Sequence, residues 1–345
     1  MGAITLNKIR IVNWILTRRC NLRCSYCRIV SDYEGSPKDY PKIEHFNKYE
    51  MTTGMVIEGL TRIKKHNSDC FHIFYGGEPL LRKDLPEIIK YCNDNDIHYT
   101  IITNNSDAIQ PALNSLLEKV EVKGLSSSVD PIIFNPTASG DRLEKSISGL
   151  ERLKALKGKV KDLVAEITVD VENVKYLYEL VKDLSDNGIS SSITFIDISK
   201  SPYYDFANVT DESVLVSQSV ELYNIFKKIV DEKLDVHMAE KLLPKLFDSL
   251  PSDYDCKLEE NLSNITVDAD GQMRLCLRIQ GKYTTAASVT NFLDRDGIIS
   301  QMFLKYIIMD KKKLCLGCNW TCPMMSSIIN EDKKVDSLIH STKRS

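Results

Sequence analysis

The sequence predicts an α/β fold built on a parallel sheet with helices outside it. Between residues 9 and 198, six β-prone runs alternate with amphipathic helical segments, and the connections between them are short. Strands separated by helices pair in parallel, because a parallel pair needs a long crossover connection. The alternation leaves open a barrel-like sheet and an open, doubly wound sheet, but no G-x-G-x-x-G motif follows the first strand.

Each expected strand is an apolar or β-branched run. The run at 70–75 is nearly continuous in apolar residues, which is typical of a strand covered on both faces. The expected strands are residues 9–17, 70–75, 97–103, 124–129, 163–169 and 191–198.

The segments between these strands carry apolar residues at helical spacing, as Val56, Leu60 and Ile63 do in the first of them. The expected helices are residues 51–66, 85–95, 108–119, 139–157, 173–185, 211–234 and 238–250. Farther along, two β-prone runs flank Asp270-Gly271 and predict a hairpin of 262–267 with 272–277, before a helix at 297–308.

We expect three parts along the chain. A core domain covers 5–235, a linker helix and a cysteine-rich region cover 236–325, and a charged tail covers 326–345. Within the core domain, residues 28–50 are irregular and form either a substrate-facing insertion or a solvated loop.

The composition is that of a soluble globular protein, with 43% hydrophobic and 27% charged residues among 345. The net charge of −3 gives no basic field of the kind that nucleic acid attracts. No apolar stretch is long enough for a membrane span, and no secretory signal opens the chain. Ten cysteines without an export signal indicate metal binding or catalysis in a reducing compartment, so we expect a cytoplasmic protein.

Three cysteines with C-x3-C-x2-C spacing follow the first strand: Cys20, Cys24 and Cys27. Three thiolates on one loop can hold three irons of a cubane cluster and leave the fourth iron open to a small molecule. A structural zinc site or an electron-transfer cluster takes four ligands. Nearby cations favour thiolate over thiol and would offset the charge of such a cluster. The arginines flanking the loop are Arg18, Arg19, Arg23 and Arg28.

This loop resembles the cluster-binding signature of the radical S-adenosylmethionine (radical SAM) superfamily. The resemblance implies that its three cysteines bind a [4Fe–4S] cluster and that S-adenosylmethionine chelates the unique iron. It also implies a partial (β/α)6 TIM-like barrel with a small C-terminal cysteine-rich extension of hairpin and helix. Gly76, Gly77 and Glu78 end the second strand and resemble the family's GGE motif, which receives the cofactor's amino group. Glycines let a backbone approach a ligand closely.

Polar residues at the ends of later strands are further candidates, because these ends form the catalytic face of a β/α barrel. Asn104, Ser127 and Asp130 either contact ribose or substrate or cap the strand ends. Thr168 and Asn173 follow the same reasoning more weakly.

A second group of cysteines lies near the C-terminus: Cys256, Cys276, Cys315, Cys318 and Cys322. The C-x2-C pair indicates a metal site, and zinc is one possibility. The group also resembles the SPASM or twitch extension of radical SAM enzymes. That resemblance implies one auxiliary [4Fe–4S] cluster, bound by the first four of these cysteines. Cys322 is then left over, replaces one ligand, or takes part in the reaction as a thiol. For Cys70 and Cys92, inside an expected strand and helix, we expect core packing.

The resemblance implies an enzyme that reductively cleaves S-adenosylmethionine to a 5′-deoxyadenosyl radical, which then abstracts a hydrogen atom from the substrate. A flavodoxin or ferredoxin is the expected reductant. We expect a peptide or related natural product as substrate, with small-molecule dehydrogenation (carbinol oxidation) or nucleotide cyclisation as alternatives. The first strand begins about ten residues into the chain, so we expect no fused leader-peptide-binding domain. The alternative from another class is a non-catalytic iron–sulfur or zinc-binding protein, which the GGE motif beside an open cluster loop argues against.

Overall fold

The computed structural model describes residues 9–22, 48–134, 141–170, 173–195, 220–237, 239–240, 243, 264–274 and 288. These residues form an eight-stranded sheet in the order β6-β5-β4-β3-β2-β1-β7-β8. Neighbouring strands from β6 to β7 pair in parallel, and β7 and β8 pair antiparallel. The strands are β1 (Ile11–Thr17), β2 (Phe71–Gly76), β3 (His98–Thr103), β4 (Gly124–Val129), β5 (Asp162–Val169), β6 (Ser190–Phe195), β7 (Asn264–Val267) and β8 (Met273–Arg274).

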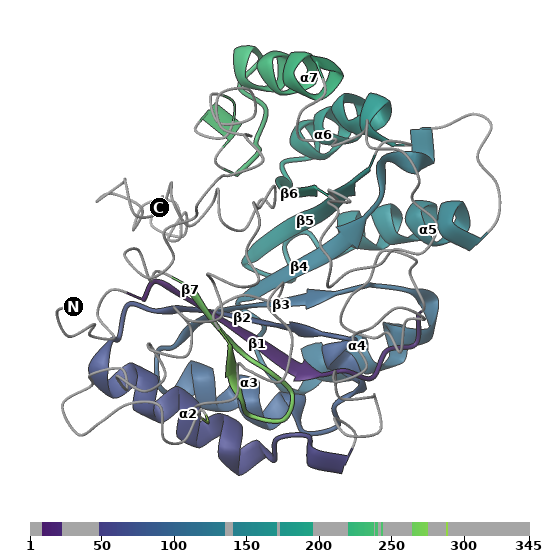
Figure 1. Ribbon diagram of the computed structural model, residues 1–345. Helices are drawn as coiled ribbons and strands as arrows, with labels where there is room; N and C mark the ends of the chain where they lie inside the picture. Colours follow the sequence, from purple (N-terminus) through teal and green to yellow (C-terminus); the bar gives the residue numbers. More distant parts are fainter. Residues whose placement is uncertain are drawn as a thin grey trace, which may run out of the picture.

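Helices lie on the outside of a curved, open sheet (Figure 1). This arrangement confirms the expected α/β fold and its partial barrel. The helices are α2 (Thr53–His66), α3 (Leu85–Asp94), α4 (Gln110–Lys119), α5 (Asp141–Ala155), α6 (Leu177–Asp186) and α7 (Val220–Asp231). Short 3-10 turns follow several strands, namely η2 (Pro79–Leu81), η3 (Asp107–Ile109), η4 (Pro131–Phe134) and η5 (Val174–Tyr176). Within the described ranges, no helix combines the length and apolar character needed to cross a membrane.

The six strands expected in the core are all present, and their described ends lie within two residues of the prediction, while 196–198 of the last expected strand lie outside the described residues. The expected helix 173–185 begins instead as the 3-10 turn η5, and α6 starts at Leu177. Other expectations fall wholly or largely outside the described residues: most of the insertion 28–50, the starting part 211–219 of one helix, most of 238–250, the helix 297–308 and the tail 326–345.

Alternation along each strand divides its side chains between two faces. On β1, Val12, Trp14 and Leu16 are fully buried and join one hydrophobic core with residues of α2, α3 and α4. A second core lies beneath α5, α6 and α7 and includes Ile167 of β5 and Phe226 of α7. The alternate strand residues face the inner side of the curved sheet, which we call the concave face.

The β7–β8 hairpin extends the sheet of the barrel. β7 pairs in parallel with β1, from Ile11 opposite Asn264 to Trp14 opposite Val267. Ile265 and Val267 enter the same core as Trp14, so burial of apolar surface stabilises the pairing. The expected hairpin is therefore confirmed where it is described, while its outer parts, 262–263 and 275–277, lie outside the described residues. Its first strand covers an edge of β1 that the core strands leave open.

Candidate functional site

The cysteine loop leaves the C-terminal end of β1, and Cys20 is the cysteine of this loop that the structure describes. Its Sγ atom accepts hydrogen bonds from the backbone N–H of Leu22 at 3.4 Å and from Nδ2 of Asn104 at 3.8 Å. The side chain is half-buried. Cys24 and Cys27 lie outside the described residues, and no three metal-binding side chains gather among the residues that are described. N–H donors directed at sulfur fit a thiolate ligand of an iron–sulfur cluster.

Gly76 and Gly77 hold the start of the cysteine loop against the end of β2. The backbone N–H of Gly77 donates to the Thr17 carbonyl at 2.7 Å, and the N–H of Glu78 donates to the Arg19 carbonyl at 2.8 Å. A Cβ at residue 76 would lie 2.2 Å from the Thr17 oxygen, and one at residue 77 would lie 2.1 Å from the Arg19 oxygen. Both positions therefore require glycine because the two backbones touch.

Glu78 is fully buried and joins the ends of β2 and β3. Its Oε1 accepts hydrogen bonds from the backbone N–H of Leu80 at 3.1 Å and from the hydroxyl of Thr103 at 3.0 Å. Its Oε2 accepts the backbone N–H of Asn104 at 2.8 Å. The carboxylate thus positions Asn104, and its expected contact with a cofactor amine stays a prediction.

Asn104 connects β3 to the cysteine loop. Its Oδ1 accepts the backbone N–H of Ser106 at 3.0 Å, while its Nδ2 donates to Oδ1 of Asn21 at 2.9 Å and points a second N–H at Cys20. Asn21 in turn donates from Nδ2 to the Ser106 hydroxyl at 2.8 Å. The sequence left open whether Asn104 contacts ribose or substrate or caps the strand end. In the structure, its side-chain amide faces the cysteine loop.

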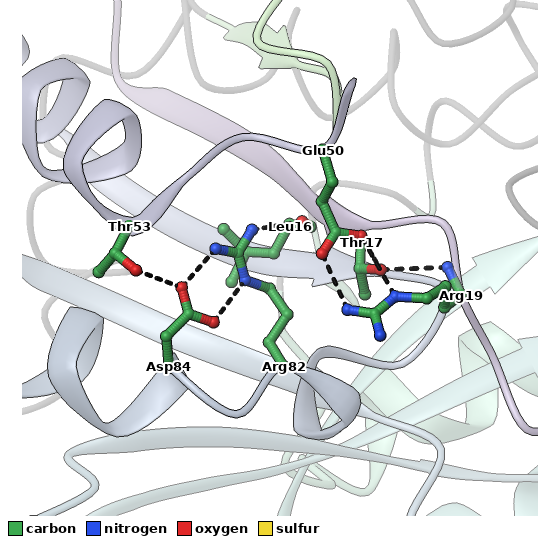
Figure 2. Close-up of polar contacts among 7 residues, drawn as sticks. All are labelled: Leu16, Thr17, Arg19, Glu50, Thr53, Arg82 and Asp84. Carbon is green, nitrogen blue, oxygen red and sulfur yellow. Dashed lines mark hydrogen bonds and ion pairs between the residues drawn. The ribbon is translucent and has the colours of Figure 1, made fainter. Parts of the chain in front are cut away.

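The two arginines before Cys20 are held by carboxylates. Arg18 is 2% exposed and forms a two-pronged ion pair with the buried Asp268, at 2.9 Å from Nε and 2.7 Å from Nη2. Figure 2 shows Arg19 paired with Glu50, which also accepts the hydroxyl of Thr17 at 2.5 Å. This corrects the expectation that Arg18 and Arg19 offset the charge of a cluster, because their charges are already balanced. Arg23 and Arg28 lie outside the described residues.

A second ion pair supports the other side of β1 (Figure 2). Arg82 donates from Nη1 to the Leu16 carbonyl at 2.9 Å and pairs with Asp84 at 2.6 Å, and Asp84 also accepts the Thr53 hydroxyl at 2.6 Å. Burial alone would raise the pKa of Asp84, but the hydrogen bonds from Arg82 and Thr53 outweigh it and lower that pKa. The end of β1 is thus fixed from α2 and from the segment after β2.

Two further candidates are Ser127 on β4 and Asp130 directly after it. Ser127 is fully buried on the helix-facing side, between Leu125 and Val129 of the two cores, and its Oγ has no hydrogen-bond partner among the residues that the structure describes. Its placement does not fit contact with a ligand on the concave face. Asp130 accepts the backbone N–H of Ile132 at 3.0 Å and Nδ2 of Asn173 at 2.9 Å, as strand-end capping requires.

The concave face carries residues that the sequence reasoning missed. Glu166 of β5 lies in register with Ser128 of β4 and Ser192 of β6. Its Oε1 accepts the hydroxyls of Ser192 at 3.3 Å and Thr194 at 3.4 Å. Burial raises the pKa of Glu166 to about 7, and these two hydrogen bonds only partly oppose that rise. The two-residue period of strands could have identified these positions, since Ala165 and Ile167 are plainly apolar.

The C-terminal cysteines lie outside the described residues: Cys256, Cys276, Cys315, Cys318 and Cys322. Cys70 and Cys92 are buried in the first core, as expected, and burial raises the pKa of each to about 12. Their thiols therefore stay protonated at neutral pH.

Comparison with known proteins identifies one matching family and similar proteins. Residues 14–198 match the family described as the Radical SAM superfamily. The chain is 23% identical to a "Probable GTP 3′,8-cyclase" of Sulfolobus acidocaldarius, over 76% of this chain and 79% of that protein. It is 25% identical to the "Radical SAM cyclopropyl synthase TigE" of Paramaledivibacter caminithermalis, over 64% of this chain but only 47% of TigE.

A solved structure shares the fold. The crystal structure of Streptococcus suis SuiB bound to the precursor peptide SuiA superposes with a TM-score of 0.59 at 16% identity. The superposition covers 95% of this chain and 74% of SuiB.

Proposed function

The chain belongs to the radical SAM superfamily and is an enzyme of that family, and we propose that its substrate is a peptide or a related natural product. Cys20, Cys24 and Cys27 are the residues that would hold the [4Fe–4S] cluster. When bound, the cluster and S-adenosylmethionine supply a 5′-deoxyadenosyl radical that abstracts a hydrogen atom from carbon.

The observation that carries the choice of substrate is the charge of the concave face. Among the described residues of β1 to β6 on that face there is no lysine and no arginine. The half formed by β1 and β2 is largely apolar, with Ile11, Ile15, Phe71, Ile73 and Tyr75. The opposite half carries hydroxyls and, on β5, the carboxyl groups of Asp162 and Glu166; its hydroxyl residues include Ser126, Ser128, Thr168, Ser192 and Thr194.

This surface suits a peptide better than a nucleoside triphosphate. Apolar side chains fit the first half, and backbone or side-chain amides fit the hydroxyls and Glu166. A triphosphate would need arginine or lysine partners, which β1 to β6 do not provide on this face. A peptide substrate is also supported by SuiB, a structure of similar fold that is bound to the precursor peptide SuiA.

Nucleotide cyclisation is the second candidate, because several relatives carry the name GTP 3′,8-cyclase. Its phosphate-binding cations would have to come from segments other than β1 to β6. Small-molecule dehydrogenation remains the third candidate.

Deuterium transfer distinguishes these substrates. The reconstituted enzyme is incubated anaerobically with S-adenosylmethionine, dithionite and either a perdeuterated peptide digest or deuterated GTP. The deuterium content of the 5′-deoxyadenosine formed is then measured by mass spectrometry. We expect deuterium in 5′-deoxyadenosine only from the peptide mixture. Deuterium arriving from GTP would reject the proposal, and a Cys20→Ala variant serves as the control that makes no 5′-deoxyadenosine.

We propose further that a flavodoxin or ferredoxin supplies the electron in a cytoplasmic setting. The auxiliary cluster is likewise a proposal, with Cys256, Cys276, Cys315 and Cys318 as its ligands.

A further inference from the structure

The orientation of the Asn104 amide is determined by its partners. An amide oxygen and nitrogen can be exchanged by a flip, so their assignment must come from the hydrogen-bond network. Here the backbone N–H of Ser106 requires an acceptor, which places Oδ1 beside it at 3.0 Å. The nitrogen must then face the cysteine loop, where one N–H meets Oδ1 of Asn21 and the other meets the Sγ of Cys20.

The backbone of Asn104 is fixed independently of that network. Its N–H donates to Oε2 of the buried Glu78 at 2.8 Å, and the residue directly follows β3. The side chain therefore has little freedom to leave Cys20, whose Sγ also accepts the N–H of Leu22. Two donors thus converge on one sulfur.

We propose that Asn104 is a positioning residue that donates a hydrogen bond to the cluster ligand Cys20 and makes the cluster easier to reduce. Reduction adds one electron, taken from the external reductant, so negative charge grows on the iron, sulfide and thiolate atoms. An N–H donor stabilises that added charge, and hydrogen bonds to cluster sulfurs are among the features that determine reduction potentials. The inference rests on Cys20 being a cluster ligand, and it is independent of the substrate.

The test measures the midpoint potential of the cluster by an anaerobic redox titration followed by electron paramagnetic resonance. The relevant signal is the one that changes when S-adenosylmethionine is added. Asn104→Leu removes the donor at similar volume, and Asn104→Asp keeps the acceptor for Ser106 while removing the donor. We expect both variants to shift the potential to more negative values, with the larger shift for Asn104→Asp because it adds a negative charge.

Ser106→Ala is the matched control. It removes the hydroxyl that accepts from Asn21 but keeps the backbone N–H that orients the Asn104 amide, so its potential should equal that of the unmodified enzyme. An equal shift in Ser106→Ala, or an unchanged potential in both Asn104 variants, would overturn the proposal. Loss of cluster iron in both Asn104 variants at an unchanged unfolding temperature would also overturn it, since Asn104 would then serve assembly.

Cys20→Ala separates this inference from the ligand assignment. If that variant keeps the signal that responds to S-adenosylmethionine, Cys20 is not a ligand and both statements fail. If it loses the signal while the Asn104 variants keep an unchanged potential, the ligand assignment stands and only the role of Asn104 fails.

Discussion

Glu78 accepts hydrogen bonds from Leu80, Thr103 and Asn104, groups that belong to the ends of two neighbouring strands. Through Asn104 it helps to hold Asn21 and Cys20, neither of which lies on its own strand. Gly76 and Gly77 act on the same loop from its other end, through the Thr17 and Arg19 carbonyls. At the scale of single residues, the Gly-Gly-Glu run therefore clamps the cysteine loop.

Gly77→Ala should loosen this clamp. The new Cβ would lie 2.1 Å from the Arg19 oxygen, so the backbone of the cysteine loop must shift. We expect a destabilisation of at least about 1–3 kcal/mol and a loss of cluster iron, measured by urea unfolding and iron analysis. Gly54→Ala is the control, because its Cβ would meet nothing closer than 3.9 Å, and it should be neutral or slightly stabilising. Equal behaviour of the two variants would contradict the clamp.

Glu166 should make stability depend on pH. Its pKa rises from 4.5 to about 7 on folding, so the folded protein holds a proton that the unfolded chain releases above pH 4.5. Stability linked to this residue is therefore present below pH 4.5 and declines as the pH rises toward 7, by up to about 3 kcal/mol.

Glu166→Gln should remove this contribution, so the free energy of unfolding of the unmodified protein minus that of the variant should fall between pH 4.5 and 7. The difference is the relevant quantity because the buried His72, whose pKa is lowered to about 3, gives both proteins a slope of opposite sign. Urea unfolding of the metal-free proteins at intervals across this range measures it, with the exposed Glu58→Gln as a control whose difference stays constant. A constant difference for Glu166→Gln would contradict the raised pKa of Glu166.

At the scale of elements, the β7–β8 hairpin is joined to the end of β1 by more than strand pairing. Arg18 and Asp268 form a buried ion pair between residues 250 positions apart, and the Ala269 carbonyl accepts the N–H of Met51 at 2.7 Å. Gly271, at φ +78, closes the hairpin against Met51 and Met55. The hairpin thus contacts both the start of the cysteine loop and the beginning of α2.

Breaking this ion pair should be costly. Arg18→Met or Asp268→Leu leaves one charge buried without its partner, so we expect each to lower the free energy of unfolding by about 3–5 kcal/mol. The double variant should lose much less than the sum of the two, because no uncompensated charge remains. Arg62→Ala, which breaks an exposed pair with Glu58, should cost under about 1 kcal/mol. Additive losses in the double variant would mean that the two side chains act separately.

The sequence predicted the elements well and their long-range partners poorly. The core strands were found because most of them are apolar or β-branched runs between helical segments, and the cysteine loop was found because its spacing is distinctive. Ser126, Ser127 and Ser128 are identical in type, so their facing follows only from their two-residue spacing to Leu125 and Val129, and a shift of one residue reverses the face. Likewise, β7 has four residues, and nothing near it indicates a partner strand at the other end of the chain.

At the scale of the whole molecule, two cysteine groups predict two metal centres. The Cys20/Cys24/Cys27→Ala variant should retain about four of about eight irons per chain after reconstitution and make no 5′-deoxyadenosine. Retained zinc would identify the second site as structural.

Cys322→Ala should keep the auxiliary cluster, whereas Cys276→Ala and Cys318→Ala should lose or degrade it. If Cys322→Ala alone strips that iron, the proposed ligand set is wrong, and intact clusters with stalled turnover would make Cys322 a participant in the reaction.

The pairing of β1 with β7 has a consequence for biosynthesis. β1 leaves the ribosome before both of its neighbouring strands, and one of these neighbours and the partner of Arg18 come about 250 residues later. At about 5–20 residues per second, the nascent chain therefore carries β1 with an unpaired edge for roughly 12 to 50 s. Unpaired edges are templates for wrong pairing between chains. During this interval, the strand that delivers the cysteine loop is therefore exposed to such mispairing.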